Sequence, residues 1–341
     1  MKCLVYHGPM DVRIEECQKP EINSNEVLVK VLACGLCTTD VKTIRKGHRY
    51  IKPPCVLGHE IAGKIVEVGR EVRGFREGEL VVVAPYAPCD SCYFCLKGQH
   101  SLCEELFEQF PRPGGFAEFV AVPERIVRKG LIRMEGVQPE EACLTEPLAC
   151  CLHGMKNLNL QPQDTVLIIG SGPMGLMLLQ IAKLFGASYV IVSDLLDKRL
   201  EVASKIGADA ILNPSKEEVS EQVKALTEGR GADRVIVAVG SPIAISQGIS
   251  CVRKGGTVLL FGGCPPGSVM EVEPNMVHYD EVSLVGSFGF SPSDFSSAAH
   301  LIKERKLQLK DIISKRVEFD RVLEAVNLVS EAKCLKVVVL P

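Results

Sequence analysis

The feature that most restricts the fold of this chain is a glycine-rich turn between an apolar strand and a helix. Residues 165–169 (TVLII) predict a fully buried strand, and residues 173–185 carry apolar side chains at helical spacing. The turn between them has the pattern G-x-G-x-x-G. The first glycine permits a tight turn, the second lets the backbone approach a pyrophosphate, and the third lets helix and strand pack closely. The pattern predicts a dinucleotide-binding turn made of Gly170, Ser171, Gly172, Pro173, Met174 and Gly175.

The residues after this turn continue to alternate between strands and helices. Apolar runs at 189–193, 234–239 and 257–261 predict further strands, and the spacing over 199–206 predicts a helix. Strands that alternate with helices assemble into a parallel sheet through right-handed crossovers. This part of the chain is therefore predicted to be an α/β domain with a doubly wound parallel sheet.

An acidic residue at the end of the second strand bears on the choice of cofactor. Asp194 stands 19 residues after Gly175. A carboxylate at this place binds the ribose hydroxyls of NAD and repels the 2′-phosphate of NADP, so the sequence favours NAD. Arg199 can pack on the adenine ribose and is the feature that keeps NADP as the alternative. A purely structural explanation is that the glycines close a turn and Asp194 caps the next loop.

The first 130 residues have a β-rich pattern. Short apolar stretches alternate with Gly, Pro and charged residues, as in a barrel-like fold, at 27–31, 61–68, 80–84 and 116–122. A chain of 341 residues is too long for one ordinary domain and suits two. We expect a β-rich domain at 1–147, an inserted nucleotide-binding domain at 148–286, and a return to the first domain at 287–341.

Four of the fifteen cysteines are spaced to hold one metal ion. Cys89, Cys92, Cys95 and Cys103 form C-x2-C-x2-C-x7-C, in a lobe at about residues 86–105. Two-residue spacing lets neighbouring thiolates converge, and four of them close a tetrahedral site that has no open position. Such a site holds a loop together. Zinc is the favoured metal, and an iron–sulfur cluster is the chemical alternative.

Composition restricts the compartment and the partners. The N-terminal residues lack the apolar core and cleavage site of a signal peptide, and no apolar run is long enough to span a membrane. We therefore expect a cytoplasmic protein, in which clustered thiols stay reduced and bind metal. The formal net charge is −3, which does not indicate a nucleic-acid surface.

A third motif carries a family resemblance. The segment Gly58-His59-Glu60-x-x-Gly63-x5-Gly69-x-x-Val72 is similar to the zinc-type signature of the medium-chain dehydrogenase/reductase family, and the other motifs stand in that family's order. The resemblance covers essentially the whole chain. Glu146-Pro147-Leu148 resembles the polyol (sorbitol) and threonine dehydrogenase branch. The resemblance implies a GroES-like β-barrel catalytic domain with an inserted Rossmann domain, two zinc ions per chain, and a dimer or tetramer.

The same resemblance implies roles for individual residues of a catalytic zinc site. Cys37 and His59 resemble the two fixed zinc ligands. Glu146 resembles a carboxylate that binds zinc directly or through its water, and Glu60 the adjacent carboxylate that approaches or exchanges onto the metal. Thr39 matches the hydroxyl that hands on the substrate proton. Four further residues resemble the surroundings of the nicotinamide and the strand ends below it: Val239, Gly263, Ser287 and Phe288.

One departure from the family pattern lies five residues after Cys37. Many family members have a His there that relays the proton, whereas this chain has Lys42, and a protonated lysine cannot accept that proton. Basic residues follow it at Arg45, Lys46, His48, Arg49 and Lys52. One explanation is a solvated, charged loop. The other is that this loop steers an anionic substrate such as a sugar acid or a phosphorylated polyol.

Two further departures concern sorbitol itself. Gly289 stands where sorbitol dehydrogenases have an Arg that touches substrate hydroxyls, and Thr43 replaces a Tyr. These departures argue against sorbitol as the substrate. The resemblance still implies zinc- and NAD-dependent oxidation of a secondary alcohol in a polyol or sugar-derived substrate. A threonine-type or vicinal-diol dehydrogenase is the neighbouring alternative. A zinc-ribbon binding protein and a thiol redox sensor are the alternatives from other classes.

Overall fold

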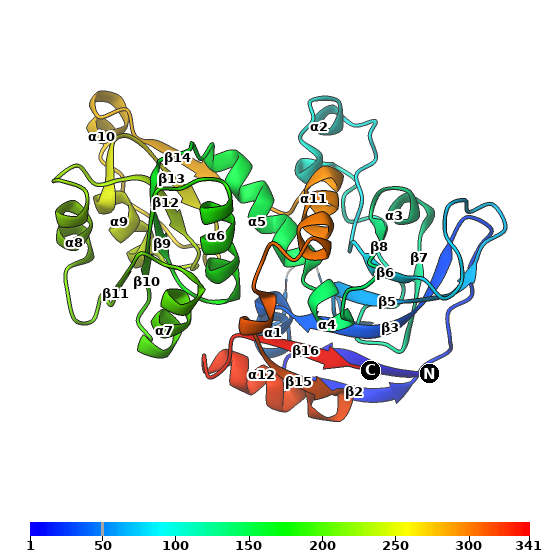
Figure 1. Cartoon of the computed structure of the whole chain (residues 1–341). Coiled ribbons are helices and arrows are strands. Elements are labelled where there is room, and N and C mark those ends of the chain that lie inside the picture. The colour runs from blue at the N-terminus through cyan, green and yellow to red at the C-terminus, as the bar shows by residue number, and fades with distance from the viewer. Residues whose placement is uncertain (49–50) are drawn as a thin grey trace. The chain divides into compact units, whose positions relative to one another are not determined.

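The computed structural model describes residues 1–48 and 51–341, which divide into two compact units (Figure 1). Unit 1 comprises Met1–Ala149 and Phe290–Pro341, and unit 2 comprises Cys150–Gly289. The predicted fold class is confirmed, because unit 2 contains a parallel sheet with helices and unit 1 is rich in β-strands. No helix among the described residues has both the length and the apolar character needed to cross a bilayer.

Unit 2 is built on a six-stranded parallel sheet. In sheet order its strands are β11 (Ala210–Leu212), β10 (Tyr189–Ser193), β9 (Thr165–Ile169), β12 (Ala232–Val237), β13 (Val252–Leu260) and β14 (Ser283–Gly286). Numbered along the chain, this order is 3-2-1-4-5-6, that of a doubly wound sheet. The strand order reverses between β9 and β12, and ligands of such sheets bind outside the carboxyl ends of the strands at this point.

Helices cover both faces of this sheet (Figure 1). They are α6 (Pro173–Leu184), α7 (Asp197–Ile206), α8 (Val219–Leu226), α9 (Pro242–Cys251) and α10 (Pro274–Tyr279). Leu167 of β9 shares a core cluster with Val223 of α8 and Ile245 of α9. The next strand residue, Ile168, is also fully buried, and α6 packs against β9. A strand that buries both faces reads as a continuous apolar run, which explains the sequence of β9.

Unit 1 contains a seven-stranded and a three-stranded sheet. The larger sheet has the order β15 (Ile313–Glu318), β16 (Lys336–Leu340), β3 (Val27–Leu36), β5 (Glu60–Val68), β6 (Leu80–Val83) and β8 (Leu131–Arg133), with β7 (Phe119–Val122) also paired to β3. The smaller sheet has the order β2 (Asp11–Glu16), β1 (Lys2–Gly8) and β4 (Cys55–Val56). Strand β3 thus lies between β5 and the last strand of the chain, β16.

Short helices connect the strands of unit 1. They are α1 (Thr38–Lys46), α2 (Tyr93–Leu96), α3 (Glu124–Lys129), α4 (Pro139–Ala142), α11 (Pro292–Lys303) and α12 (Val322–Ser330), with 3₁₀ turns at His100–Leu102, Leu309–Asp311 and Phe319–Arg321. Helix α5 (Thr145–Leu158) begins in unit 1 and ends in unit 2. Helix α1 follows β3 after one residue, so β3 places the start of α1.

The predicted strands are all observed, and their ends differ where pairing extends them. The run at 27–31 becomes β3, which continues to Leu36 because its later residues pair with both β5 and β16. The run at 116–122 shortens to β7, and the run at 257–261 begins earlier, at Val252, in β13. Predicted helices at 173–185 and 199–206 are observed as α6 and α7.

The third glycine of the turn gives a test of the fold. A Cβ on Gly175 would overlap with the carbonyl oxygen of Gly170. Gly175→Ala should therefore push α6 away from β9, lower the free energy of unfolding by about 1–3 kcal/mol and weaken dinucleotide binding. Denaturant unfolding and cofactor titration measure these effects.

Gly286→Ala in β14 is the matched control, because a Cβ there has no atom within 4 Å. It should change the free energy of unfolding by less than about 0.5 kcal/mol. Equal stabilities of the two variants would contradict the packing role of Gly175.

Candidate functional site

Three side chains from the ends of β3 and β5 converge in unit 1. One ligand atom each of Cys37, His59 and Glu60 lies within 4.8 Å of the other two. Strands β3 and β5 are antiparallel and Gly35 pairs with Glu60, so the end of β3 lies beside the start of β5. A Cβ on Gly35 would overlap with Oε2 of Glu60. Glycine at this position therefore leaves the space that the Glu60 carboxylate occupies.

Asp40 contacts two of these three residues, Cys37 and His59. It is 2% exposed, and its carboxylate accepts hydrogen bonds from the backbone N–H of Cys37 (3.0 Å) and of Gly58 (3.4 Å). The same carboxylate lies 3.4 Å from Nδ1 of His59. Burial acts to lower the pKa of His59, but Asp40 and Cys37 outweigh it, so this pKa is raised. A metal-ligating His normally donates its other ring N–H to a carboxylate, and Asp40 is placed to accept it.

A buried ion pair holds the third side chain. Nζ of Lys336, the first residue of β16, pairs with Oε1 of Glu60 and donates to the carbonyl of Leu36 at 3.4 Å. Glu60 is fully buried and Lys336 is 4% exposed. Burial opposes the charge of Lys336, but Glu60 and Cys37 raise its pKa. Oε2 of Glu60 has no hydrogen-bond partner within the described chain, so one buried oxygen is left for a cation.

The remaining predicted residues of this site lie on α1 and α5. Thr39 is exposed in the first turn of α1, and its N–H donates to Sγ of Cys37 at 3.5 Å. Lys42 is exposed one turn further along α1. Arg49 lies outside the described residues. Glu146, 8% exposed near the start of α5, is not part of the Cys37–His59–Glu60 group.

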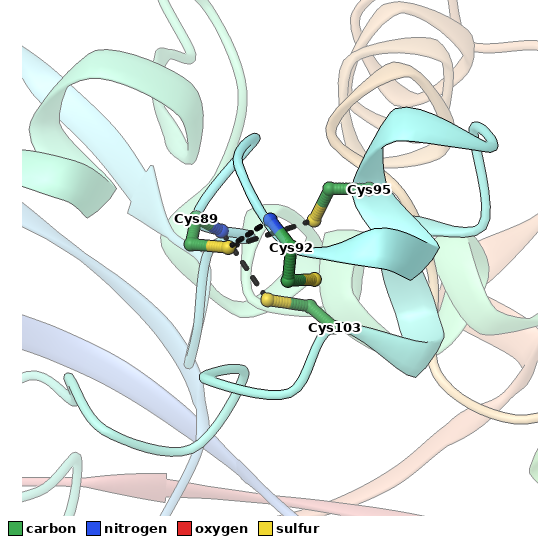
Figure 2. A group of neighbouring side chains, drawn as sticks. All are labelled: Cys89, Cys92, Cys95 and Cys103. Carbon is green, nitrogen blue, oxygen red and sulfur yellow. Dashed lines mark hydrogen bonds between the residues drawn. The ribbon is translucent and has the colours of Figure 1, made fainter.

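The four predicted cysteines also converge (Figure 2). Cys89, Cys92, Cys95 and Cys103 have their sulfur atoms within 4.8 Å of one another. Backbone N–H groups of Ser91 and Cys92 donate to Sγ of Cys89 at 3.4 and 3.3 Å. Hydrogen bonds from Ser91 lower the pKa of Cys89 to about 6, which favours the thiolate that binds metal.

Helix α3 attaches this cysteine loop to unit 1. Lys129 donates to the carbonyl of Pro88 at 2.7 Å and pairs with Asp90, and Arg125 pairs with Glu105 at 2.8 Å. Both ends of the loop are therefore held by cations. Four thiolates in a closed set suit zinc and also suit an iron–sulfur cluster, and such a set leaves no position for a substrate.

The predicted cofactor residues of unit 2 gather at the carboxyl end of its sheet. Asp194 accepts hydrogen bonds from the backbone N–H of Ser171 (2.7 Å) and of Leu196 (2.9 Å). Nη1 of Arg199 lies 4.0 Å from the Asp194 carboxylate and 3.8 Å from a Cβ placed on Gly172. Asp194 and Arg199 thus flank the turn at 170–175.

Three buried polar atoms at this turn lack hydrogen-bond partners within the described chain. Within the described chain, Oγ of Ser171, Oγ of Ser193 and Nε of Arg199 are buried and make no hydrogen bond. Such atoms are rare in proteins and need a ligand or water. The glycine pattern does not predict a role for these serine hydroxyls. Their only signal in the sequence is their position, directly after the first glycine and directly before Asp194.

The strand ends around the turn approach one another closely. A Cβ on Gly170 would lie 2.5 Å from the Val239 side chain, and one on Gly240 would overlap with the carbonyl oxygen of Gly263. Ser287 and Phe288 follow β14 directly, and Phe288 is 55% exposed. Most of the predicted cofactor residues therefore follow the carboxyl end of a strand within a few residues, and Arg199 lies in the first turn of α7.

Removing the partner of a buried carboxylate tests the ion pair. Lys336→Met should lower the free energy of unfolding by about 3–5 kcal/mol, because Glu60 would stay buried without a cation. The double variant with Glu60→Gln should recover most of this loss. Lys310→Met is the control, because Lys310 pairs with Glu141 and is 80% exposed. This change should lower the free energy of unfolding by less than about 1 kcal/mol. Equal costs in denaturant unfolding for the two single variants would disprove the role of Lys336.

Asp40→Asn tests the support of His59. The amide oxygen can still accept the N–H of Cys37 and cap α1, but its charge towards His59 is lost. We expect zinc affinity at the Cys37 group to fall about 10–100-fold. Chelator competition measures this affinity, and the four-cysteine site of the same molecule is the internal reference. If Asp40→Asn lost metal from both sites at the same chelator concentration, the effect would not be specific to the Cys37 group and the prediction would be wrong.

Comparison with known proteins finds a family match in each of the two units. A model of the alcohol dehydrogenase GroES-like domain matches residues 23–131, and a model of zinc-binding dehydrogenases matches residues 173–304. The chain is 32% identical to a sorbitol dehydrogenase of Bacillus subtilis, over all of this chain and 97% of that protein. It is 35% identical to an L-threonine 3-dehydrogenase of Pyrococcus horikoshii, over 95% and 93% of the two chains.

A solved structure is similar over the full length. It is a zinc-binding dehydrogenase of Sinorhizobium meliloti with bound NADP, 32% identical, with a TM-score of 0.93 and coverage of 100% of this chain and 99% of that one. Three observations indicate one family. They are the matches to both family models, the full-length identities, and the convergence of Cys37, His59 and Glu60. The chain belongs to the zinc-dependent medium-chain dehydrogenase family, in its polyol and threonine dehydrogenase-like branch.

Proposed function

We propose that this enzyme oxidises a secondary alcohol of a polyol or sugar-derived substrate to a ketone by hydride transfer to NAD. The observation that carries this proposal is the group of Cys37, His59 and Glu60, in which a buried carboxylate oxygen has no partner within the described chain. One thiolate, one imidazole and one carboxylate are ligands that zinc accepts. The relationship to a sorbitol dehydrogenase supports a polyol substrate.

The protein residues around the metal have distinct roles in this proposal. Zinc, when bound, acts as a Lewis acid that makes a hydroxyl group easier to deprotonate. Asp40 orients His59, and Lys336 holds the Glu60 carboxylate in place. The exposed hydroxyl of Thr39, two residues after Cys37, accepts the substrate proton and passes it outwards. We propose Glu146 as a further zinc ligand, either directly or through water.

The cofactor proposal rests on Asp194. Its carboxylate is held by two backbone N–H groups beside the glycine turn, so its position and charge are fixed there. A fixed negative charge binds ribose hydroxyls and repels a 2′-phosphate, so we favour NAD over NADP. The Sinorhizobium meliloti relative was solved with NADP, and Arg199 is the residue of this chain that suits the alternative. Val239, Gly263, Ser287 and Phe288 are proposed to surround the nicotinamide.

Two further features follow from the proposal. The four-cysteine site is proposed to hold a second, structural zinc, so each chain binds two zinc ions. Clustered cysteines bind metal where thiols stay reduced, so we propose that the enzyme is cytoplasmic. We also propose that it is a homodimer or homotetramer. Threonine is the second candidate substrate, supported by the 35% identity to a threonine dehydrogenase.

Metal analysis and a substrate panel test the function. Purified enzyme should contain two zinc ions per chain and form NADH with one or more C4–C7 polyols or sugar acids. A chelator should abolish turnover by removing the metal of the mixed ligand set before that of the four-cysteine site, and added zinc should restore it. Turnover of threonine alone would select the second candidate. A single metal ion without turnover of any alcohol would favour a binding protein instead.

A further inference from the structure

Helix α1 has two faces with opposite character. The buried face consists of Asp40, Val41, Thr43 and Ile44. The exposed face begins with Thr38 and Thr39 and continues with Lys42, Arg45 and Lys46. The basic residues therefore form a stripe that starts one helical turn from Thr39 and from the metal-binding side chains. We call this stripe of Lys42, Arg45 and Lys46 the basic face.

Acidic residues near the basic face are few among the described residues. The only acidic residue of α1 is Asp40, which is buried and engaged with Cys37 and His59. Within the part of the chain that the structure describes, none of the three cations forms an ion pair. Glu331 is paired with Lys333 at 2.6 Å. Lys333 lowers the pKa of Glu331 most, and Arg45 adds a smaller electrostatic effect.

Helix stability also fails to explain Lys42. Cations in the last turn of a helix stabilise its negative end, which accounts for Arg45 and Lys46. Lys42 lies in the middle of α1, three and four residues before these two cations. Like charges at such spacings repel one another and destabilise a helix. The position of Lys42 is therefore not explained by interaction with a helix end or by charge pairing within α1.

The charge of the surrounding segment differs from that of the whole chain. Residues 38–52 contain five lysine and arginine residues and one acidic residue, whereas the whole chain has a formal net charge of −3. A local excess of positive charge raises the concentration of anions and speeds their arrival. The segment is thus suited to attract an anion to the region of Thr39.

We infer that the substrate of the proposed reaction carries an anionic group at the end of its carbon chain, and that Lys42 binds this group. The inference rests on the proposed oxidation of a polyol. Thr39 and Lys42 are three residues apart on one helix, and side chains at this spacing have Cβ atoms about 5–6 Å apart. A chain of several carbons covers that distance between the oxidised carbon and its charged end. A phosphate monoester and a carboxylate both satisfy this chemistry, since lysine binds either as a point charge.

The test compares three substrates that differ only at one end: a pentitol, its terminal phosphate ester and the corresponding aldonate. The enzyme is the full chain with zinc and NAD. Wild type should prefer one of the two anionic substrates, and the preferred one identifies the group. Lys42→Ala should lower kcat/KM for that substrate about 10–100-fold more than for the neutral pentitol, as expected for loss of a hydrogen bond to a charged group. Lys42→Arg, which keeps the charge, should restore most of the difference.

Lys303→Ala is the matched control, because Lys303 is an exposed lysine at the end of α11 that forms no ion pair among the described residues. It should leave the ratio of anionic to neutral turnover unchanged. An equal loss for neutral and anionic substrates in Lys42→Ala would overturn the inference. A rise in the KM for NAD without a change in this ratio would also overturn it and assign the basic face to the cofactor.

A binding measurement separates this inference from the proposed function. Lys42→Ala should weaken equilibrium binding of the anionic substrate by the same factor as it lowers the kcat/KM ratio. If wild type oxidises none of the three substrates or any other polyol, the proposed function fails. Binding of the phosphate ester and of the aldonate then still decides the inference, and dissociation constants that Lys42→Ala leaves unchanged would reject it.

Discussion

A carboxylate and an ammonium group buried together organise unit 1. Glu60 opens β5 and Lys336 opens β16, and β3 lies between these two strands in the sheet. The pair spans β3 where Gly35 leaves room for the carboxylate and where the carbonyl of Leu36 accepts from Lys336. Because an isolated charge is costly to bury, neither residue can take its place without the other. The pair thereby fixes the ends of three strands, and one of these ends carries Cys37.

Local sequence patterns predict the glycine turn, the four-cysteine group and the parallel sheet of this protein. The glycine turn at 170–175 and the cysteine spacing at 89–103 each require only a few neighbouring residues, so the sequence alone indicates their geometry. The strand-and-helix alternation predicts the parallel sheet for the same reason. His59 and Glu60 were identified through a family resemblance, since their motif has no meaning from spacing alone.

Residues that act over long sequence distances escaped prediction. Lys336 stands in the strand sequence LKVVVL, where a lysine indicates only an exposed position, and its partner is 276 residues away. Gly35 gains its role only when β5 is laid beside β3. Asp40 stands three positions after the N-cap of α1, where an acidic residue forms a capping box, so its sequence position indicates only a structural role. Its contact with His59 depends on the pairing of β3 and β5, which the sequence does not specify.

The two metal groups differ in how their charge is compensated. Four thiolates carry more negative charge than a divalent ion removes, and the cysteine loop offsets the excess with backbone N–H groups. The Cys37 group has one thiolate, and its carboxylate is already shared with Lys336. Glu60 can therefore turn an oxygen towards the metal or away from it while remaining neutralised. In the proposed function, the four-cysteine group is closed because four ligands fill it, and the shared carboxylate of Glu60 leaves the Cys37 group open to exchange.

Helix α1 separates the holding of the metal from the contact with substrate. Cys37 caps the helix, Asp40 reaches back from its first turn, and Val41 and Ile44 bury the same face in unit 1. These residues fix the metal-binding side chains, so any change among them alters the site itself. Positions on the opposite face contact none of these ligands through their side chains, because successive residues of a helix point in different directions. A change at residue 42 can thus leave Cys37 and Asp40 in place, so the proposed substrate contact can vary without altering the proposed metal site.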